Sequence, residues 1–350
     1  MTTRPTIADV ARLAGVHAGT VSRALNPKTE GRVNRTTVAR VRRAAKQLGY
    51  TPNSIARGLR TSSSMTVGVV VPDLTNPIFP PMVRGIESTL APRGYSAVIV
   101  NTDGSDELER LLVDSLLQRQ VDGLIFATGH SEHASAADAF QRGVKAVMVN
   151  RDARGVPFPA VVGDDAAGIR DALDHLAALG HRRVVHLAGP GTFSTGTIRA
   201  SAFLARCAEL GLEGEVLRAV AYSVEEGTRL TREVVEDRLP MPTAIVAGND
   251  LLALGAYHAL REHGLRCPGD VSVVGFNDMP FAGDFQPPMT TVRVPHFDLG
   301  AEAARLLLDQ LDAESNGVTP VRIVLPVELV VRGSTGPPEE APSGGRPVTR

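Results

Sequence analysis

Apolar residues recur at helical spacing through the first fifty positions of the 350-residue chain. They form three stripes: Ile7, Val10, Ala11 and Ala14, then Val16, Val21 and Leu25, and finally Val38, Val41, Ala45 and Leu48. This spacing predicts two short helices that meet at Gly15 and a third from about Thr36 to Leu48. Thr6 followed by Asp9 matches a capping box, which marks the start of the first helix.

From Val67 onward, short β-branched runs alternate with amphipathic segments. The predicted strands are Val67–Val71, Ala97–Asn101, Gly123–Ala127, Ala146–Asn150, Val161–Gly163, Val184–Ala188, Val216–Ala221, Ala244–Ala247, Val271–Phe276, Val321–Leu325 and Glu328–Val331. The predicted helices are Phe79–Arg93, Glu107–Arg119, Asp165–Leu179, Ile198–Leu210, Val224–Asp237, Leu251–His263 and Leu299–Leu311. We therefore predict a small all-α headpiece followed by an α/β core of two doubly wound, parallel-sheet lobes. Ligands bind such lobes at the carboxyl ends of the strands, here between the lobes.

Charge is unevenly divided along the chain. Residues 1–62 contain twelve Lys and Arg residues but only two acids, Asp9 and Glu30, which gives this part a net charge of +10. The whole chain has a net charge of −1, so the remainder carries −11. A basic helical head on an acidic body is the pattern expected of a module that binds a polyanion. A solvated basic helix face is the simpler alternative.

Several classes of protein are disfavoured by what the sequence lacks. No apolar run approaches the roughly 18 residues of a membrane span, and the first ten residues lack the apolar core of a signal peptide, so we expect a cytoplasmic protein. Cys207 and Cys267 have no His or Cys at metal-ligand spacing, and we expect both to be reduced structural residues. The sequence has no P-loop and no G-x-S-x-G motif, and in the loop at 188–196 a misplaced third glycine and Pro190 argue against a dinucleotide site. We predict no enzyme activity, no cofactor and no metal site.

Six motifs occur in a distinctive order and spacing: TIADVARLAGV, TVSRALN, LGYTPNSIARGLRT, VGVVVPDLTNPIFPPMVRGIE, GND and VVGFND. By these motifs the chain resembles the lac repressor (LacI/GalR) family of bacterial transcription regulators, from Thr6 to about Arg332. The resemblance implies a helix-turn-helix headpiece at 1–50, a hinge helix and linker at 51–64, and a two-lobed, periplasmic-binding-protein-like core at 65–332. The core of that family binds an effector and dimerises. The Pro-, Gly- and Ser-rich tail at 333–350 is predicted to be disordered.

The same resemblance places the DNA contacts. The expected set is Thr6, His17, Ala18, Gly19, Thr20, Ser22, Arg23, Asn26, Asn53, Ala56 and Leu59. Ala18, Gly19 and Arg23 match positions that read base edges, and an arginine there can donate two hydrogen bonds to guanine. Ala18 and Gly19 offer only apolar contact or close approach, unlike members with polar residues there.

Other headpiece residues have less specific roles by the resemblance. Thr20, Ser22 and Asn26 match residues that position the phosphate backbone. His17 either contacts phosphate or is an exposed residue at the helix start without a role. Leu59 matches the apolar wedge that hinge helices insert into the minor groove, and its alternative is a packing contact within the hinge.

The same resemblance also places the expected effector contacts, most of which follow strand ends. They are Asp73, Asn76, Phe79, Asn150, Arg151, Arg199, Asn249, Asp250 and Asn277. Arginine, amide and carboxylate groups suit vicinal hydroxyls, and Phe79 offers a face for a sugar ring or base. Asn150 and Asn277 stand where sugar-binding members often have Asp, which weakens the expectation of an ordinary hexose. Each residue has an alternative as a strand-end cap or turn residue.

Together these features predict a sequence-specific DNA-binding regulator. The resemblance implies repression, and activation stays open as the alternative. A sugar or related metabolite between the lobes would control its operator affinity. The expected partners are double-stranded operator DNA, the effector and a second copy in a homodimer, with no membrane. The alternative is a cytoplasmic sugar-binding or sugar-processing α/β protein with a basic N-terminal module. A periplasmic receptor is disfavoured by the missing signal peptide.

The wedge role of Leu59 is tested by Leu59→Ala. A smaller side chain opens the central base step less, so we expect weaker bending of operator DNA in a circular-permutation gel assay. Bending equal to that of the wild type would instead identify Leu59 as a packing residue of the hinge.

Overall fold

The computed structural model describes residues 5–26, 29–50, 63–130, 133–153, 155–237, 240–313 and 320–339. The chain forms two compact units, Met1–Ser64 and Met65–Arg350, and each is described by itself. The predicted DNA contacts Asn53, Ala56 and Leu59 lie outside the described residues. None of the helices in the described part of the chain is both long and apolar enough to cross a bilayer.

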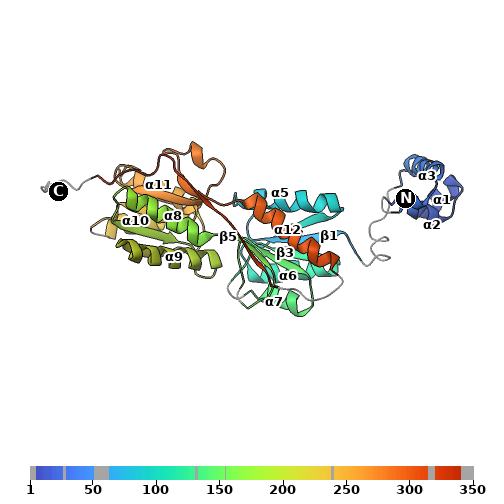
Figure 1. Ribbon diagram of the computed structural model, residues 1–350, viewed down its shortest axis with the longest axis horizontal. Helices are drawn as coiled ribbons and strands as arrows, with labels where there is room; N and C mark the ends of the chain where they lie inside the picture. The colour runs from blue at the N-terminus through green and yellow to red at the C-terminus, as the bar shows by residue number, and fades with distance from the viewer. Residues whose placement is uncertain are drawn as a thin grey trace. The chain divides into compact units, whose positions relative to one another are not determined.

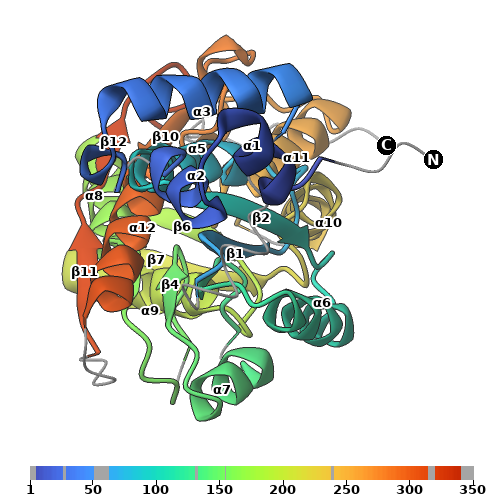
Figure 2. The same ribbon diagram turned by 90° about the vertical axis from the view of Figure 1, so that its right-hand side faces the viewer.

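In its described residues the first unit is a bundle of three helices, as predicted (Figure 2). They are α1 (Ile7–Ala14), α2 (Ala18–Ala24) and α3 (Arg35–Leu48), with a short 3-10 turn η1 (Glu30–Arg32) before α3. The capping box is formed, because Thr6 and Asp9 each accept a hydrogen bond from the other's backbone N–H. Gly15 ends α1 with φ of 61°, a left-handed conformation that glycine adopts without strain.

The second unit contains two lobes, each built on a six-stranded sheet (Figure 1). Lobe 1 has strand order β11-β5-β4-β3-β1-β2 and lobe 2 has β12-β10-β9-β8-β6-β7. Lobe 1 comprises β1 (Thr66–Val71), α5 (Phe79–Leu90), η2 (Ala91–Arg93), β2 (Ser96–Asn101), α6 (Asp106–Gln118), β3 (Gly123–Phe126), α7 (Ala134–Gln141), β4 (Ala146–Val149), β5 (Ala160–Gly163), α12 (His296–Asp312) and β11 (Arg322–Leu325). Lobe 2 comprises α8 (Asp165–Ala178), β6 (Arg183–Ala188), α9 (Ser194–Leu210), β7 (Glu213–Arg218), α10 (Val224–Asp237), β8 (Ala244–Ala247), α11 (Asp250–Glu262), β9 (Ser272–Asn277), η3 (Ala282–Asp284), β10 (Thr290–Arg293) and β12 (Glu328–Val330). The predicted fold class is confirmed, and the pairs are parallel except β10 with β12.

Two of the differences from the sequence-based expectation concern strands and have a clear physical reason. The short strand β10 was not predicted, because it follows a proline-rich turn and ends on a charged residue. The strand predicted at Val216–Ala221 is wrong by three residues, since β7 begins at Glu213. As an edge strand it begins with exposed and half-buried residues and buries only Leu217, so the limits of its apolar run are not the limits of the strand.

The chain crosses between the lobes three times, at β5 to α8, at β10 to α12 and at β11 to β12 (Figure 1). As a consequence α12 belongs to lobe 1 although the segments before it belong to lobe 2. The sequence predicted a simple restart after β5 and did not predict this return.

Helices α5 and α12 pack with their backbones in contact at two glycines. A Cβ on Gly300 would lie 2.0 Å from the Met82 carbonyl oxygen, and one on Gly85 would lie 2.0 Å from that of Phe297. Lobe 2 has the same arrangement between α10 and α11, where Cβ atoms on Gly227 and Gly255 would each lie 2.2 Å from a carbonyl oxygen of the other helix. No side chain larger than hydrogen fits at these four positions without moving backbone.

The prediction of a disordered tail from residue 333 is wrong for its first part. Ser334 is fully buried, and its hydroxyl donates to the Val273 carbonyl oxygen at 2.6 Å and accepts from the Thr290 N–H at 2.8 Å. The Gly336 carbonyl lies 3.0 Å from Nε2 of His181, and Glu339 pairs with Arg266. Small polar residues here satisfy backbone groups of lobe 2, which composition alone does not reveal. Residues 340–350 lie outside the described chain.

The contact at Gly300 is tested by Gly300→Ala. The added methyl must push α12 away from α5, so we expect the free energy of unfolding to fall by about 1–3 kcal/mol. Urea denaturation measures it, and Gly191→Ala is the matched control, because its Cβ would meet only the Arg218 side chain, at 3.7 Å. Equal midpoints for the two variants would contradict the packing argument.

Candidate functional site

Helix α2 carries most of the DNA contacts that the sequence predicts. His17 caps its start, since Nδ1 accepts a hydrogen bond from the Gly19 N–H at 3.1 Å. The sequence predicted for His17 either a phosphate contact or no role, and it did not predict a helix cap, because a capping residue is more often Ser, Thr, Asp or Asn. The cap requires an unprotonated Nδ1, and it fixes the direction of the helix that presents Arg23.

Arg23 is exposed, whereas Val21 and Ala24 on the same helix are fully buried. Arg12 pairs with Asp9 and Arg42 pairs with Glu30, but within the described residues the Arg23 guanidinium has neither an ion pair nor a hydrogen bond. Thr6 and His17 are exposed, and the remaining predicted contacts on and beside α2 are half-buried: Ala18, Gly19, Thr20, Ser22 and Asn26. Arg23 is therefore the long side chain of α2 that is available to a ligand.

In the core, the two lobes meet around Arg151, which follows β4 of lobe 1. Its guanidinium carbon lies 3.7 Å from the ring centre of Phe193 and 5.9 Å from that of Tyr222, both in lobe 2. The rings of His130 and Phe193 are 4.8 Å apart, and the two residues form an isolated β-bridge. The Asp152 N–H also donates to the Ser194 hydroxyl at 3.0 Å. We call the group Arg151, Phe193, Tyr222, Arg199 and His296 the interlobe site.

Arg199 joins this site from α9 of lobe 2. Its Nε and Nη2 donate to one Asp165 carboxylate oxygen at 2.9 and 2.7 Å, and its Nη1 donates to the Gly248 carbonyl at 2.5 Å. Its guanidinium also lies 3.7 Å from the ring centre of Phe276. Arg199 is thus held firmly beside the residues that precede Asn249 and Asn277.

Burial dominates the electrostatics of the interlobe site. It lowers the pKa of Arg151 to about 10, and it lowers the pKa of His296 to about 3, with a further contribution from the charge of Arg199. Burial also raises the pKa of Asp165, although its ion pair with Arg199 opposes that change. Among the described residues, Arg151 Nε and His296 Nε2 are buried without a hydrogen-bond partner, which is uncommon in folded proteins.

Asn150 and Asn277 end the corresponding strands β4 and β9 in the two lobes. Their φ angles are 66° and 119°, in the region that L residues other than glycine rarely adopt. Both side chains are more than nine-tenths buried, and within the described residues neither amide has a hydrogen-bond partner. Strained backbone and unpartnered amides are features that cluster at binding sites.

Two predicted effector contacts have structural roles. The Asn249 side chain caps α11 by accepting from the Leu252 N–H at 2.9 Å. Asp250 accepts from the Met279 N–H at 2.7 Å and from the Thr291 hydroxyl at 2.5 Å. Burial raises the pKa of Asp250 to about 7.

The remaining three predicted contacts lie after β1 in lobe 1. Asp73 accepts from the Thr75 N–H at 2.8 Å, and Asn76 accepts from the Ile78 N–H at 3.3 Å. Phe79 is 1% exposed and belongs to the hydrophobic core, so it does not offer an open ring face. Within the described residues, no hydrogen bond, ion pair or ring contact joins these three to Arg151 or Arg199.

Sequence reasoning missed Phe193, Tyr222, His130 and His296. Phe193 and Tyr222 lie in the loops that follow β6 and β7, so strand ends followed by an aromatic residue would have indicated them. His296 could not be found in this way, because it is placed by the unpredicted return of α12 to lobe 1.

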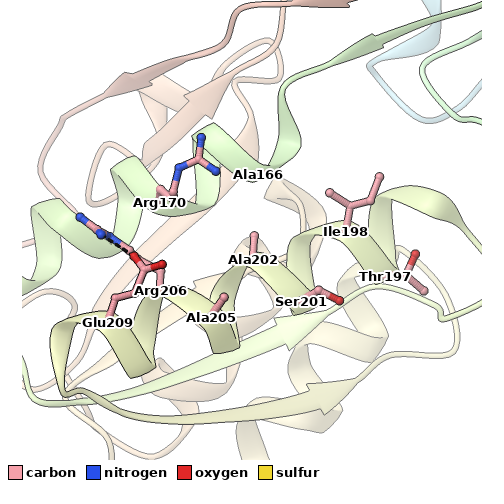
Figure 3. A pocket seen from close by; sticks show the side chains of 9 residues that line it. All are labelled: Ala166, Arg170, Thr197, Ile198, Ser201, Ala202, Ala205, Arg206 and Glu209. Carbon is pink, nitrogen blue, oxygen red and sulfur yellow. Dashed lines mark hydrogen bonds and ion pairs between the residues drawn. The ribbon is translucent and has the colours of Figure 1, made fainter. Parts of the chain in front are cut away.

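A separate pocket of about 450 Å³ lies between α8 and α9 of lobe 2 (Figure 3). It is lined by Ala166, Arg170, Thr197, Ile198, Ser201, Ala202, Ala205, Arg206 and Glu209. The Arg206 guanidinium is paired with Glu209 and with Asp174. None of the predicted effector contacts lines this pocket.

Comparison with known proteins identifies the family. The description "Bacterial regulatory proteins, lacI family" matches residues 6–53, and "Periplasmic binding protein-like domain" matches residues 173–335. The ribose operon repressor of Halalkalibacterium halodurans is 34% identical over 333 residues, which cover 94% of this chain and 97% of that protein. The chain belongs to the lacI family of bacterial regulatory proteins.

Solved structures of lacI-family proteins agree with the fold. A lac repressor dimer bound to operator and the anti-inducer ONPF has a TM-score of 0.84 at 28% identity, covering 95% of this chain and 100% of that one. A complex of the transcriptional regulator CelR with cellobiose has a TM-score of 0.72 at 34% identity, with the same coverage. This lacI-family chain is therefore a DNA-binding transcriptional regulator and not an enzyme, and the sugar-processing alternative is set aside.

The structural role of Asp250 predicts a pH effect. Its carboxyl pKa is raised from 3.8 to about 7 on folding. Its contribution to the free energy of unfolding is therefore fully present below about pH 4 and is lost as the pH rises to about 7. Asp250→Asn removes this titration, so the stability of the variant relative to the wild type should increase by about 2–3 kcal/mol between about pH 5 and pH 8.

Urea denaturation at a series of pH values measures the effect, and the slope with pH is the readout. Exposed Asp284 provides the control variant Asp284→Asn. A pH-independent difference between Asp250→Asn and the wild type would show that Asp250 is already ionised at low pH.

Proposed function

We propose that this lacI-family protein is a cytoplasmic, homodimeric repressor whose operator affinity is set by a polyhydroxylated metabolite bound at the interlobe site. The observation that carries the proposal is the contact of Arg151 in lobe 1 with Phe193 in lobe 2. A ligand that enters there touches both lobes, so its binding energy depends on how the lobes are arranged. That dependence is what an allosteric effector requires.

The ligand contacts that we propose combine residues from both lobes. Arg151 and Asn150 come from lobe 1, and Asn277, Tyr222 and Arg199 come from lobe 2. Amide and guanidinium groups donate to hydroxyl oxygens, and the rings of Phe193 and Tyr222 suit the apolar face of a sugar or base. Asn249 and Asp250 position this set through α11. Asp73 and Asn76 stay candidate contacts on the loop after β1, whereas Phe79 supports lobe 1 from its core. The ribose operon repressor and the CelR–cellobiose complex support a sugar-like effector.

A second copy has an exposed apolar surface on which to dock. Strand β2 is at the edge of the lobe 1 sheet and exposes Val98 and Ile99, and lobe 2 exposes Phe281 to 73%. An edge strand offers unpaired backbone groups, and its exposed β-branched side chains give a second chain apolar area to cover. The lac repressor dimer supports a dimer for this chain too. In a twofold dimer, two copies of α2 would meet two half-sites of a pseudo-palindromic operator.

The proposal is tested by selecting bound fragments from a random DNA pool and repeating the binding in gel shifts. We expect a symmetric consensus, a steep decrease in binding with salt, and a change of roughly 5–150-fold in affinity on adding the effector. A screen of sugars, sugar acids, sugar phosphates and nucleosides by thermal shift identifies that effector. The proposal would be overturned if the protein retained DNA fragments without sequence preference, or if no metabolite weakened or strengthened its binding to the selected operator.

The reading of a base by Arg23 is tested by Arg23→Ala. Loss of a bidentate contact to guanine should weaken binding to the selected operator by about 1–3 kcal/mol and relax the preference at one position of each half-site. Competition with operators changed at each position measures it. Exposed Arg43→Ala on α3 is the control. If Arg23→Ala weakened binding equally on all sequences, Arg23 would contact phosphate instead.

A further inference from the structure

The interlobe site contains two buried guanidinium groups, but only one has a carboxylate partner among the described residues. Arg199 has Asp165, with two hydrogen bonds to one carboxylate oxygen. Arg151 is 5% exposed, and its contacts are the Thr128 carbonyl at 3.2 Å and the face of the Phe193 ring. A buried charge without an opposite charge is costly, because protein groups replace little of the lost hydration.

The donor groups left on Arg151 have a defined geometry. Nη1 is used by the Thr128 carbonyl, and Nε is buried without a partner. The Nε and Nη2 groups form one edge of the guanidinium, and within the described residues that edge has no acceptor. Two parallel N–H donors on such an edge match the two oxygens of a carboxylate or phosphate.

The acids around the interlobe site are engaged elsewhere. Besides Asp165, Asp250 accepts from Met279 and Thr291, and Glu109 lies 2.5 Å from Nε2 of His133. Asp278 accepts a hydrogen bond from Arg293 Nε at 2.8 Å and forms an ion pair with Arg332 at 2.7 Å. With these acids occupied, the interlobe site presents mainly donors and a net positive charge to a ligand.

We propose that the effector carries an oxyanion, a carboxylate or phosphate on a polyhydroxylated body, and that the Nε–Nη2 edge of Arg151 binds it. This inference rests on the proposed function, because it names the chemical class of the same effector. The oxyanion supplies the missing countercharge, and the amides of Asn150 and Asn277 are left for the hydroxyls. Arg151 then determines specificity, because a neutral sugar of the same shape leaves the buried charge uncompensated.

The burial of Arg151 has a second consequence in the ligand-free protein. Replacing the guanidinium by a neutral amide removes an uncompensated charge, so Arg151→Gln should melt at a higher temperature than the wild type, by roughly 2–4 °C. The lowered pKa of Arg151 has the same origin, since burial opposes its charged form.

The test uses the full chain and does not require the natural effector. Inorganic phosphate and malonate are titrated at constant ionic strength, together with ribose, ribonate and ribose 5-phosphate, and glucose, gluconate and glucose 6-phosphate. We expect oxyanions to raise the melting temperature of the wild type by roughly 2–4 °C and not that of Arg151→Gln. Sugar acids or sugar phosphates should bind the wild type at least tenfold more tightly than Arg151→Gln. Malonate with the sugar acids, or phosphate with the sugar phosphates, shows which oxyanion is preferred.

Two control variants separate charge from surface effects. Arg151→Lys keeps the charge but loses the two-donor edge, so it should respond to oxyanions less than the wild type and more than Arg151→Gln. Arg84→Gln on α5 removes an exposed arginine, and it should respond as the wild type does.

The inference is overturned if oxyanions shift Arg151→Gln as much as the wild type, or if Arg151→Gln is no more stable than the wild type without ligand. It is also overturned if a neutral sugar changes operator binding with equal affinity in both proteins. In that last case the proposed function still holds, because a metabolite controls DNA binding. If oxyanions bind at Arg151 but do not change operator binding, the ligand class is right and the proposed function is wrong, because the bound ligand does not control DNA binding.

Discussion

The backbone contact between α5 and α12 determines how the two lobes are connected. Because Gly85 and Gly300 have no Cβ, the two helices approach so closely that a carbonyl oxygen of each lies where a Cβ on the other's glycine would stand. This close packing fixes the position of α12 along α5. Because α12 begins at His296, directly after the chain leaves β10, the same contact places His296 beside Arg199 in the interlobe site. A helix-packing constraint in lobe 1 therefore helps to build a site that lobe 2 shares.

Much of the fold follows from local patterns, because those patterns reflect burial within one element. The headpiece helices, the capping box at Thr6 and most strand–helix alternation of the core were predicted from apolar spacing and caps. The crossing from β10 to α12 was not, because nothing in a helix's own sequence states which sheet it covers. The ordered segment at 333–339 was also missed, since Ser334 is held by partners in β9 and β10 that are distant in sequence.

The sequence predicted where the candidate site lies better than it predicted the role of each residue there. Strand ends pointed to Arg151, Asn150 and Asn277, because parallel strands place their carboxyl ends at one edge, and a family motif pointed to Arg199 on α9. That these residues contact an effector stays a prediction. The same rule selected Asn249 and Asp250, whose side chains are used by the N-terminus of α11 and by Thr291. Residue type cannot separate these cases, because an amide that caps a helix and one that faces a ligand look alike in sequence. Hydrogen-bond partners distinguish them.

The glycine contacts of the two lobes differ in one respect that matters while the chain is being made. In lobe 2 the touching helices, α10 and α11, are neighbours in sequence, so their contact can form as soon as both have left the ribosome. In lobe 1, α5 must wait for α12, and β5 must wait for its sheet neighbour β11. Lobe 1 begins first and is completed last. Until then the apolar face of α5 lacks its cover, so the nascent chain is most exposed to aggregation during synthesis of lobe 2.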